Sequence, residues 1–160
     1  MIIVFWRKPF ECYLFFAAKT EMANQKKILV IDNDAEIIEA VKNIIMDIST
    51  IEVVHSTDNI AGAMDLLKNE EYCAILGNAN LISDSGVSYT DFIREAVSEY
   101  GDRYYNKIIV MSNNIDMIVE ALRSGAYMSI IKPLEKSELR HKLSIVIDSH
   151  LKTMPLRKNS

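Results

Sequence analysis

The chain has 160 residues, 49% of them hydrophobic, which is enough for one compact domain with a substantial core and too few for two domains. Its formal net charge of -4 argues against the basic surface of a nucleic-acid-binding domain, and no cluster of Lys and Arg offsets this. The two cysteines, Cys12 and Cys73, have no metal-ligand spacing and form no paired framework, so we expect a reducing, cytoplasmic compartment.

Residues 1–25 precede the first predicted strand, and we interpret them as an extension outside the fold. Their two apolar runs, residues 1–6 and 12–18, are separated by charged residues, and each is too short to span a bilayer. Met22 is a natural start for the folded part, although the aromatic content leaves a weak membrane or partner contact open. We therefore predict one domain over residues 26–153 and a short tail over residues 154–160.

The first predicted strand, residues 28–31, is a continuous apolar run, as expected for a strand buried on both faces. It ends in an acidic turn from which Asp34 is expected to cap a helix with an isoleucine-rich stripe. A shorter strand, residues 51–55, is followed by N-cap candidates at residues 56–58. The helix after them is predicted to turn three side chains inward, namely Ile60, Met64 and Leu67.

The third predicted strand, residues 73–76, is closed by Gly77 and Asn78. A polar loop then leads to a helix near residues 89–100. The fourth strand, residues 107–111, precedes another helix, whose pattern predicts four buried side chains: Ile115, Ile118, Val119 and Leu122.

Gly125 is expected to end that helix in a left-handed conformation. The fifth predicted strand, residues 127–131, is stopped by Lys132 and Pro133 and precedes a last amphipathic helix. Alternating strands and helices with short connections predict the α/β class, with a doubly wound parallel sheet covered by helices on both faces.

In an open sheet of this class the binding crevice lies at the carboxyl ends of the strands. Polar side chains fall at four such ends in this sequence: Asp32 with Asn33, then Asn78, Ser112 and Lys132. We take these residues as the candidate site.

The four strand ends, in this order and spacing, resemble the receiver domain of two-component response regulators. The resemblance covers about residues 26–150 and is carried by four segments: residues 27–34, 72–86, 109–112 and 121–133. It implies five parallel strands in the order 2-1-3-4-5 with five helices. It also implies a cis peptide bond before Pro133. The implied function is phosphorelay signalling, with phosphate passing from a histidine kinase to an aspartate after the third strand.

Carried over by position, the resemblance makes Asp32 and Asn33 the acidic pair that holds Mg²⁺, and Asn78 the phosphate acceptor. Ser112 and Lys132 become the two residues that contact the phosphoryl group. An amide is neutral and poorly nucleophilic, so Asn78 is not expected to accept phosphate. With one carboxylate and one lysine, the site sums to zero charge, and we expect no Mg²⁺ cofactor. The interpretation is a stand-alone receiver-like module, not an enzyme, that works without phosphorylation.

Alternatives stay open at this point. Asp84, six residues past Asn78, is a nonstandard acceptor candidate, although it is better explained as part of a turn. A flavodoxin-like ligand-binding domain is a further candidate, but the glycine pattern that cradles phosphate is missing. The position that reads out phosphorylation in the family is Ser129 here, with Tyr127 as a partial substitute.

The expected partners are proteins, either a sensor kinase or a downstream effector. By resemblance, they would bind the face made by the fourth helix, the fifth strand and the fifth helix. A homodimer through that face is also possible, while nucleic acid and a membrane span are not expected.

Overall fold

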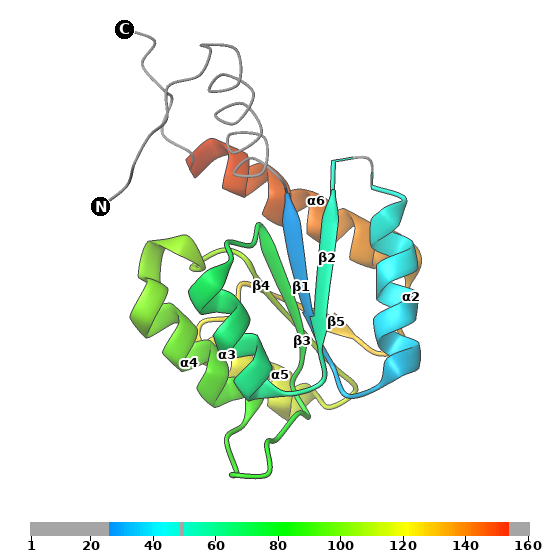
Figure 1. Ribbon diagram of the computed structural model, residues 1–160. Coiled ribbons are helices and arrows are strands. Elements are labelled where there is room, and N and C mark those ends of the chain that lie inside the picture. Colours follow the sequence, from blue (N-terminus) through cyan, green and yellow to red (C-terminus); the bar gives the residue numbers. More distant parts are fainter. Residues whose placement is uncertain (1–25, 49, 154–160) are drawn as a thin grey trace, which may run out of the picture.

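The structure is a computed structural model that describes residues 26–48 and 50–153, so the predicted extension and tail lie outside the described residues. Strands and helices alternate along the chain (Figure 1). The strands are β1 (Lys27–Ile31), β2 (Val53–Thr57), β3 (Ala74–Asn78), β4 (Ile108–Ser112) and β5 (Met128–Ile131). The helices are α2 (Ala35–Met46), α3 (Ile60–Asn69), α4 (Tyr89–Tyr100), α5 (Ile115–Ser124) and α6 (Lys136–Thr153), with a short 3-10 turn, η1 (Gly101–Arg103), after α4.

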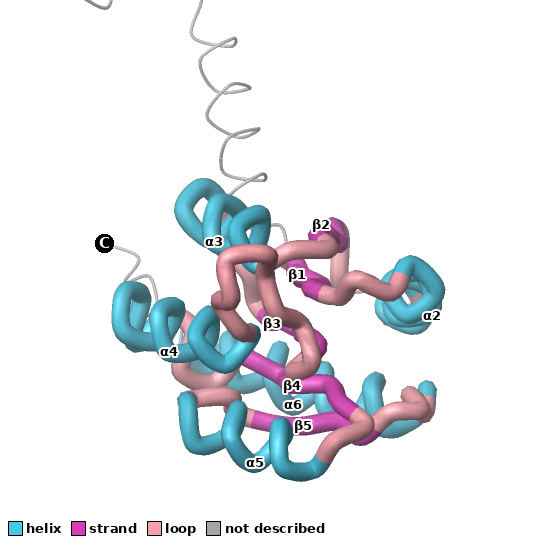
Figure 2. Tube along the Cα trace, turned by 90° about the horizontal axis from the view of Figure 1, so that it is seen from below, coloured by secondary structure: helices cyan, strands magenta, loops and turns pink. Residues whose placement is uncertain are grey.

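All five strands are parallel and lie in the order β2-β1-β3-β4-β5, which confirms the predicted topology. The register pairs Ile31 with Gly77 and Asn78 with Met111, so the carboxyl ends of the central strands meet at one edge. Figure 2 looks at the sheet from that edge. Within the described part of the chain, no helix is long and apolar enough to cross a membrane.

The sheet separates two hydrophobic clusters, because successive side chains of a strand point to opposite faces. One cluster packs α3, α4 and α5 against residues such as Leu29 and Ile75, and the other packs α2 and α6 against residues such as Ile28 and Leu76. Figure 2 shows the same division of the helices. Strands buried on both faces explain why β1 reads as an unbroken apolar run.

Local capping explains where most helices begin. The Asp34 side chain accepts hydrogen bonds from the first turn of α2, as predicted, and Ser88 forms a capping box with Asp91 at the start of α4. Gly125 ends α5 with a φ of 121°, which confirms the expected left-handed cap. The prediction for α3 was wrong: its N-cap is Asn59, because β2 continues to Thr57 and its backbone is engaged with β1.

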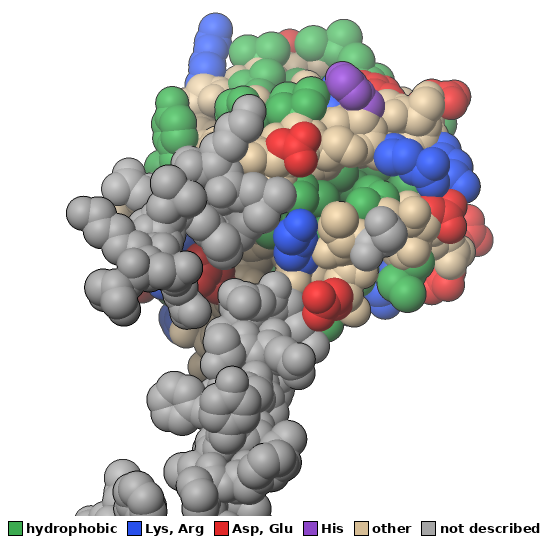
Figure 3. Space-filling model, turned by 90° about the horizontal axis from the view of Figure 1, so that it is seen from above, with side chains coloured by type: hydrophobic (Ala, Val, Ile, Leu, Met, Phe, Trp, Pro, Cys, Tyr) green, Lys and Arg blue, Asp and Glu red, His purple; other side chains and the backbone are tan. Residues whose placement is uncertain are grey.

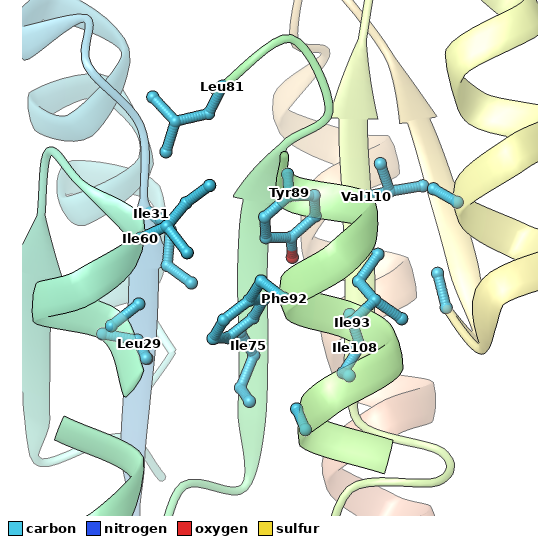
Figure 4. Close-up of a cluster of buried hydrophobic side chains, with 14 of the residues drawn as sticks. Leu29, Ile31, Ile60, Ile75, Leu81, Tyr89, Phe92, Ile93, Ile108 and Val110 are labelled. Atoms are coloured by element: carbon cyan, nitrogen blue, oxygen red, sulfur yellow. The ribbon is translucent and has the colours of Figure 1, made fainter. Parts of the chain in front are cut away.

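Gly77 is required by the packing of α4 on β3. A Cβ atom at this position would lie 2.1 Å from Cζ of Tyr89, whose ring is fully buried. Figure 4 shows the Tyr89 ring packed against β3 among the apolar side chains of this cluster. The glycine therefore lets Tyr89 of α4 pack directly on the backbone of β3, at the residue that precedes Asn78.

The prediction that α5 buries four apolar side chains was wrong for three of them. Ile118 is buried, whereas Ile115, Val119 and Leu122 are 64%, 38% and 39% exposed. These three positions follow the i, i+4, i+7 spacing of a single helical stripe. Two further exposed apolar side chains, Tyr127 just before the edge strand β5 and Ile131 at its end, lie on the sheet face that α5 covers. We call these five residues the α5–β5 strip.

The other end of the molecule, where the strands begin, has a different surface. Figure 3 views this end, and the visible basic and acidic side chains there are interspersed rather than gathered by sign. Lys27, at the start of β1, forms an ion pair of 2.5 Å with Glu70, which follows α3. The pKa of Glu70 is lowered mainly by its hydrogen bond from Lys27.

Candidate functional site

Asp32 is the centre of the crevice at the strand ends, and it is fully buried. Its Oδ1 accepts hydrogen bonds from Asn78 Nδ2 at 3.0 Å and from the backbone N–H of Asp34 at 3.1 Å. Its Oδ2 accepts one from Lys132 Nζ at 2.9 Å. Both carboxylate oxygens are therefore engaged by groups of the protein itself.

Lys132 reaches this carboxylate from the end of β5, a hundred residues further along the chain. Its side chain is 17% exposed, whereas that of Asp32 is 0% exposed. Water therefore reaches the ion pair only from the lysine side. The peptide bond between Lys132 and Pro133 is cis, as predicted. The pair brings the formal charge of the crevice to zero. A buried carboxylate without such a partner would be strongly destabilising.

Asn78 uses both ends of its amide. Its Nδ2 donates to Asp32, and its Oδ1 accepts from the backbone N–H of Asn80 at 3.0 Å. Only 8% of the residue is exposed. An ionised aspartate at this position has no donor to offer Asp32, so the amide suits this arrangement better than a carboxylate does.

Ser112 ends β4 and is fully buried. Its hydroxyl donates to Asn80 Oδ1 at 2.6 Å and accepts from the backbone N–H of Asn114 at 3.0 Å. Asn114 is in turn the N-cap of α5. Ser112 therefore connects the loop after β3 to the start of the helix that carries most of the α5–β5 strip.

Asn80 is the residue of this site that sequence reasoning missed. It lies in the loop after β3, and its Oδ1 accepts the hydrogen bond that the Ser112 hydroxyl donates. The sequence carries only a weak signal for it, an asparagine two residues after the strand end. Its role depends on the approach of two loops that are far apart in the sequence.

The structure brings together four of the predicted site residues: Asp32, Asn78, Ser112 and Lys132. Asn33 is exposed and, within the described residues, its side chain forms no hydrogen bond with these four. Ser129 lies half-buried on β5, where its carbonyl oxygen accepts from Lys142 Nζ.

Asp84 is exposed in the loop between β3 and α4. Among the described residues, no hydrogen bond or ion pair joins it to Asp32, Asn78 or Lys132. The loop is organised instead by Ser83, whose Oγ lies 2.9 Å from Ser85 Oγ and accepts from the backbone N–H of Val87. The turn interpretation of Asp84 fits this geometry.

The donor set of the crevice does not suit Mg²⁺. This ion prefers anionic oxygens and keeps several waters, and the crevice offers a single carboxylate whose oxygens already accept three hydrogen bonds. The nearby carboxylate of Asp34 accepts from two backbone N–H groups at the start of α2. In the described part of the chain, no group of three or more His, Cys, Asp or Glu side chains is placed to hold a metal.

Comparisons with known proteins agree with this fold. The family model described as the response regulator receiver domain matches residues 28–144. The search among curated proteins gave no match.

Solved structures extend the likeness to the whole fold. A CheY-like response regulator receiver domain protein from Methanospirillum hungatei has a TM-score of 0.67 at 24% identity, covering 80% of this chain and 98% of that one. The signal receiver domain of an HD domain-containing protein from Pseudomonas fluorescens has a TM-score of 0.69 at 16% identity, covering 81% and 91%. The chemotaxis response regulator CheY4 of Vibrio cholerae has a TM-score of 0.65 at 18% identity, covering 76% and 98%.

Proposed function

The chain belongs to the response regulator receiver domain family, and from this premise we propose that it signals by binding other proteins without being phosphorylated. The observation that carries the proposal is the amide of Asn78, which donates to Asp32 where the family has its acceptor carboxylate. The module would then be a pseudo-receiver that keeps the fold and has no enzymatic activity of its own.

The chemistry of phosphate transfer is poorly supported by these side chains. An acceptor must attack phosphorus through a charged oxygen, and the Asn78 amide oxygen is neutral and already accepts from Asn80. The cation that would neutralise incoming phosphate, Lys132, is paired with Asp32 at 2.9 Å. The neutral amide of Asn78 and the pairing of Lys132 with Asp32 both favour a resting state that needs neither metal nor phosphate.

Protein partners are the expected readout, and the α5–β5 strip is the surface that suits them. It presents five exposed apolar side chains on adjacent elements, whereas such side chains usually occur singly on a monomer. It belongs to the face formed by α5, β5 and α6, where we place contact with a sensor kinase, an effector or a second copy of the chain.

The test is exposure of the purified chain to acetyl phosphate and Mg²⁺, followed by intact-mass measurement. We expect no hydroxylamine-labile phosphoryl adduct on the wild-type chain. An adduct would contradict the proposal. If it maps to Asp84 and is lost in the Asp84→Asn variant, the loop carboxylate is the acceptor instead.

A double variant designed to restore Mg²⁺ binding makes this test stricter. In the variant Asn33→Asp with Asn78→Asp, three carboxylates and one lysine sum to a charge of -2, which gives Mg²⁺ a reason to bind. At a hundred times its Kd, a bound ion stabilises a protein by about 2.7 kcal/mol, so Mg²⁺ should raise the Tm of this variant by several degrees. The wild-type Tm should not respond. A Tm of the wild type that rises equally with Mg²⁺ would show that the native crevice already binds the ion.

A further inference from the structure

The crevice holds an amine and a carboxamide on the two oxygens of one buried carboxylate. Lys132 Nζ donates to Oδ2 of Asp32 at 2.9 Å, and Asn78 Nδ2 donates to Oδ1 at 3.0 Å. A lysine amine is a nucleophile once it has lost its extra proton, and the carbonyl carbon of an amide is an electrophile. A carboxylate that contacts both groups can carry protons from one nitrogen to the other.

Burial of these groups assists such a proton transfer. Asp32 is fully buried and Asn78 is 8% exposed, so neither side chain is well solvated. Moving a proton from the Lys132 ammonium to the Asp32 carboxylate turns two charges into two neutral groups, which costs less in such a site than it does in water. The same burial keeps water away from the Asn78 carbonyl, so hydrolysis of the amide competes poorly with attack by the amine.

The Asn78 carbonyl is also polarised for attack. Its Oδ1 accepts a hydrogen bond from the backbone N–H of Asn80 at 3.0 Å. Addition of an amine to Cγ places negative charge on this oxygen, and a backbone N–H that already points at it stabilises the charge. The loop after β3 therefore supplies a donor of the kind that forms an oxyanion hole.

Lys132 is the group that has to move. Bond formation requires its Nζ to come within about 3–3.5 Å of Cγ of Asn78. The amide of Asn78 is fixed at both ends by hydrogen bonds, whereas the lysine has a flexible four-carbon stem that is 17% exposed. A rotation within this stem carries the amine from Asp32 towards the carbonyl without any change in the strands.

We propose that Lys132 and Asn78 react to form an intramolecular isopeptide bond, with Asp32 as the proton carrier. The lone pair of Nζ forms a bond to Cγ of Asn78, and the bond from Cγ to Nδ2 breaks with its electron pair going to the nitrogen, so that ammonia leaves. Of the five hydrogens on the two nitrogens, one stays on the new amide, three leave with ammonia and one remains on Asp32. The crevice stays neutral, and the step consumes no oxidant or co-reactant.

The bond would tie the end of β3 to the end of β5 across the intervening strand β4. A covalent link between residues far apart in the sequence restricts the unfolded chain, so the linked protein should unfold at a higher temperature. The inference rests on the contacts of the crevice and not on the proposed function. Asn78 lacks a nucleophilic oxygen both before and after the reaction, so the phosphoryl-adduct test is read separately from this one.

Intact-mass measurement of the folded full chain during prolonged incubation in neutral buffer tests the proposal. The product should be lighter than the sequence by one ammonia, and digestion should yield a branched peptide that joins the segments around Asn78 and Lys132. Lys132→Arg keeps a cation beside Asp32 but offers a guanidinium that stays protonated, so this variant should keep its full mass. The matched control is Lys136→Arg, which alters an exposed lysine paired with Asp47 and should react as the wild type does.

The role of the carboxylate has its own readout. Asp32→Asn should slow the loss of ammonia about 100-fold or more, because the proton carrier is gone, while urea unfolding shows that the variant still folds. An unchanged mass of the wild-type chain overturns the proposal. So does a loss of ammonia without the branched peptide, which would indicate a cyclic imide at an asparagine, or an equal loss in the Lys132→Arg variant.

Discussion

At the scale of single residues, the crevice is a network in which each charge and amide has a fixed partner. Asp32 is held by Lys132 and Asn78, and Asn80 holds both Asn78 and Ser112. A neutral amide at position 78 is part of what keeps the buried carboxylate satisfied. Conversion of that amide to an acid therefore changes stability as well as chemistry.

The first prediction concerns the ion pair. Lys132→Met leaves Asp32 buried and without its cation, which should lower the free energy of unfolding by about 3 kcal/mol. Adding Asp32→Asn removes the stranded charge and should recover a large part of that loss. Urea unfolding of the two variants measures both effects.

The control for this prediction is Lys136→Met, which removes a cation from an exposed pair with Asp47 and should leave stability nearly unchanged. A double variant as unstable as Lys132→Met alone would show that the lysine matters through its packing and not through its charge.

At the scale of elements, the contact between β3 and α4 sets how closely the helix approaches the crevice. Tyr89 lies against Gly77, and among the buried side-chain polar atoms of the described residues its hydroxyl is the one without a hydrogen-bond partner. Burial raises the pKa of this phenol above its ordinary value. The ring contributes packing, while the hydroxyl contributes a cost.

The second prediction separates these two contributions. Gly77→Ala forces a methyl group into the Tyr89 ring and should destabilise the protein by about 3 kcal/mol or more. Tyr89→Phe keeps the ring and removes the unsatisfied hydroxyl, so it should stabilise by about 1 kcal/mol. Thermal and urea unfolding measure both values.

Gly86→Ala is the comparison, because that glycine has a φ of 83° and no atom within 4 Å of an added Cβ. Its cost should be about 1 kcal/mol, from backbone strain alone. If Gly77→Ala costs no more than Gly86→Ala, the close approach of α4 to β3 is not what the glycine permits.

Elements also show how far sequence reasoning reaches. The apolar period predicted the helix that became α5, but not that Ile115 and Val119 stay exposed, because a period shows only that a stripe exists and not which neighbour covers it. Likewise, the residues proposed to cap α3 belong to β2 or follow it, since pairing with β1 prolongs the strand. The strand ends were predictable because parallel strands bring their ends together, whereas the bond from Ser112 to Asn80 depends on loop geometry.

At the scale of the whole molecule, a central sheet with a cluster on each face buries several ionisable groups in their neutral form. Cys73 lies directly before β3, and its Sγ donates a hydrogen bond to the carbonyl oxygen of Lys27 at 3.2 Å. Burial raises its pKa from 9.0 to about 11. Tyr104 shows the same effect, with burial raising its pKa from 10.0 to about 12.

The third prediction is a loss of stability at high pH. Between pH 9 and about 11 the unfolded chain releases the Cys73 proton while the folded chain keeps it, so the folded state is progressively disfavoured as pH rises. For this thiol the loss is on the order of 2 kcal/mol. Urea unfolding in a series of alkaline buffers measures it.

Cys73→Ala isolates the thiol, because every other titrating group is common to both proteins. This variant should lose stability less steeply over the same pH range. Identical slopes would mean that the thiol ionises as readily in the folded chain as in the unfolded one.

The pairing of β3 with β4 also bears on the chemical ageing of the chain. Asparagine deamidates when the next backbone nitrogen attacks its side-chain carbonyl, which closes a cyclic imide and releases ammonia. Water then opens the imide to aspartate or isoaspartate. After Asn78 that nitrogen belongs to Ala79, and it donates to Met111 O at 2.9 Å. Peptide mapping after prolonged warm storage should therefore find less deamidation of Asn78 in the folded chain than in the chain unfolded in urea. The sheet thus preserves the amide against spontaneous conversion into an acceptor carboxylate.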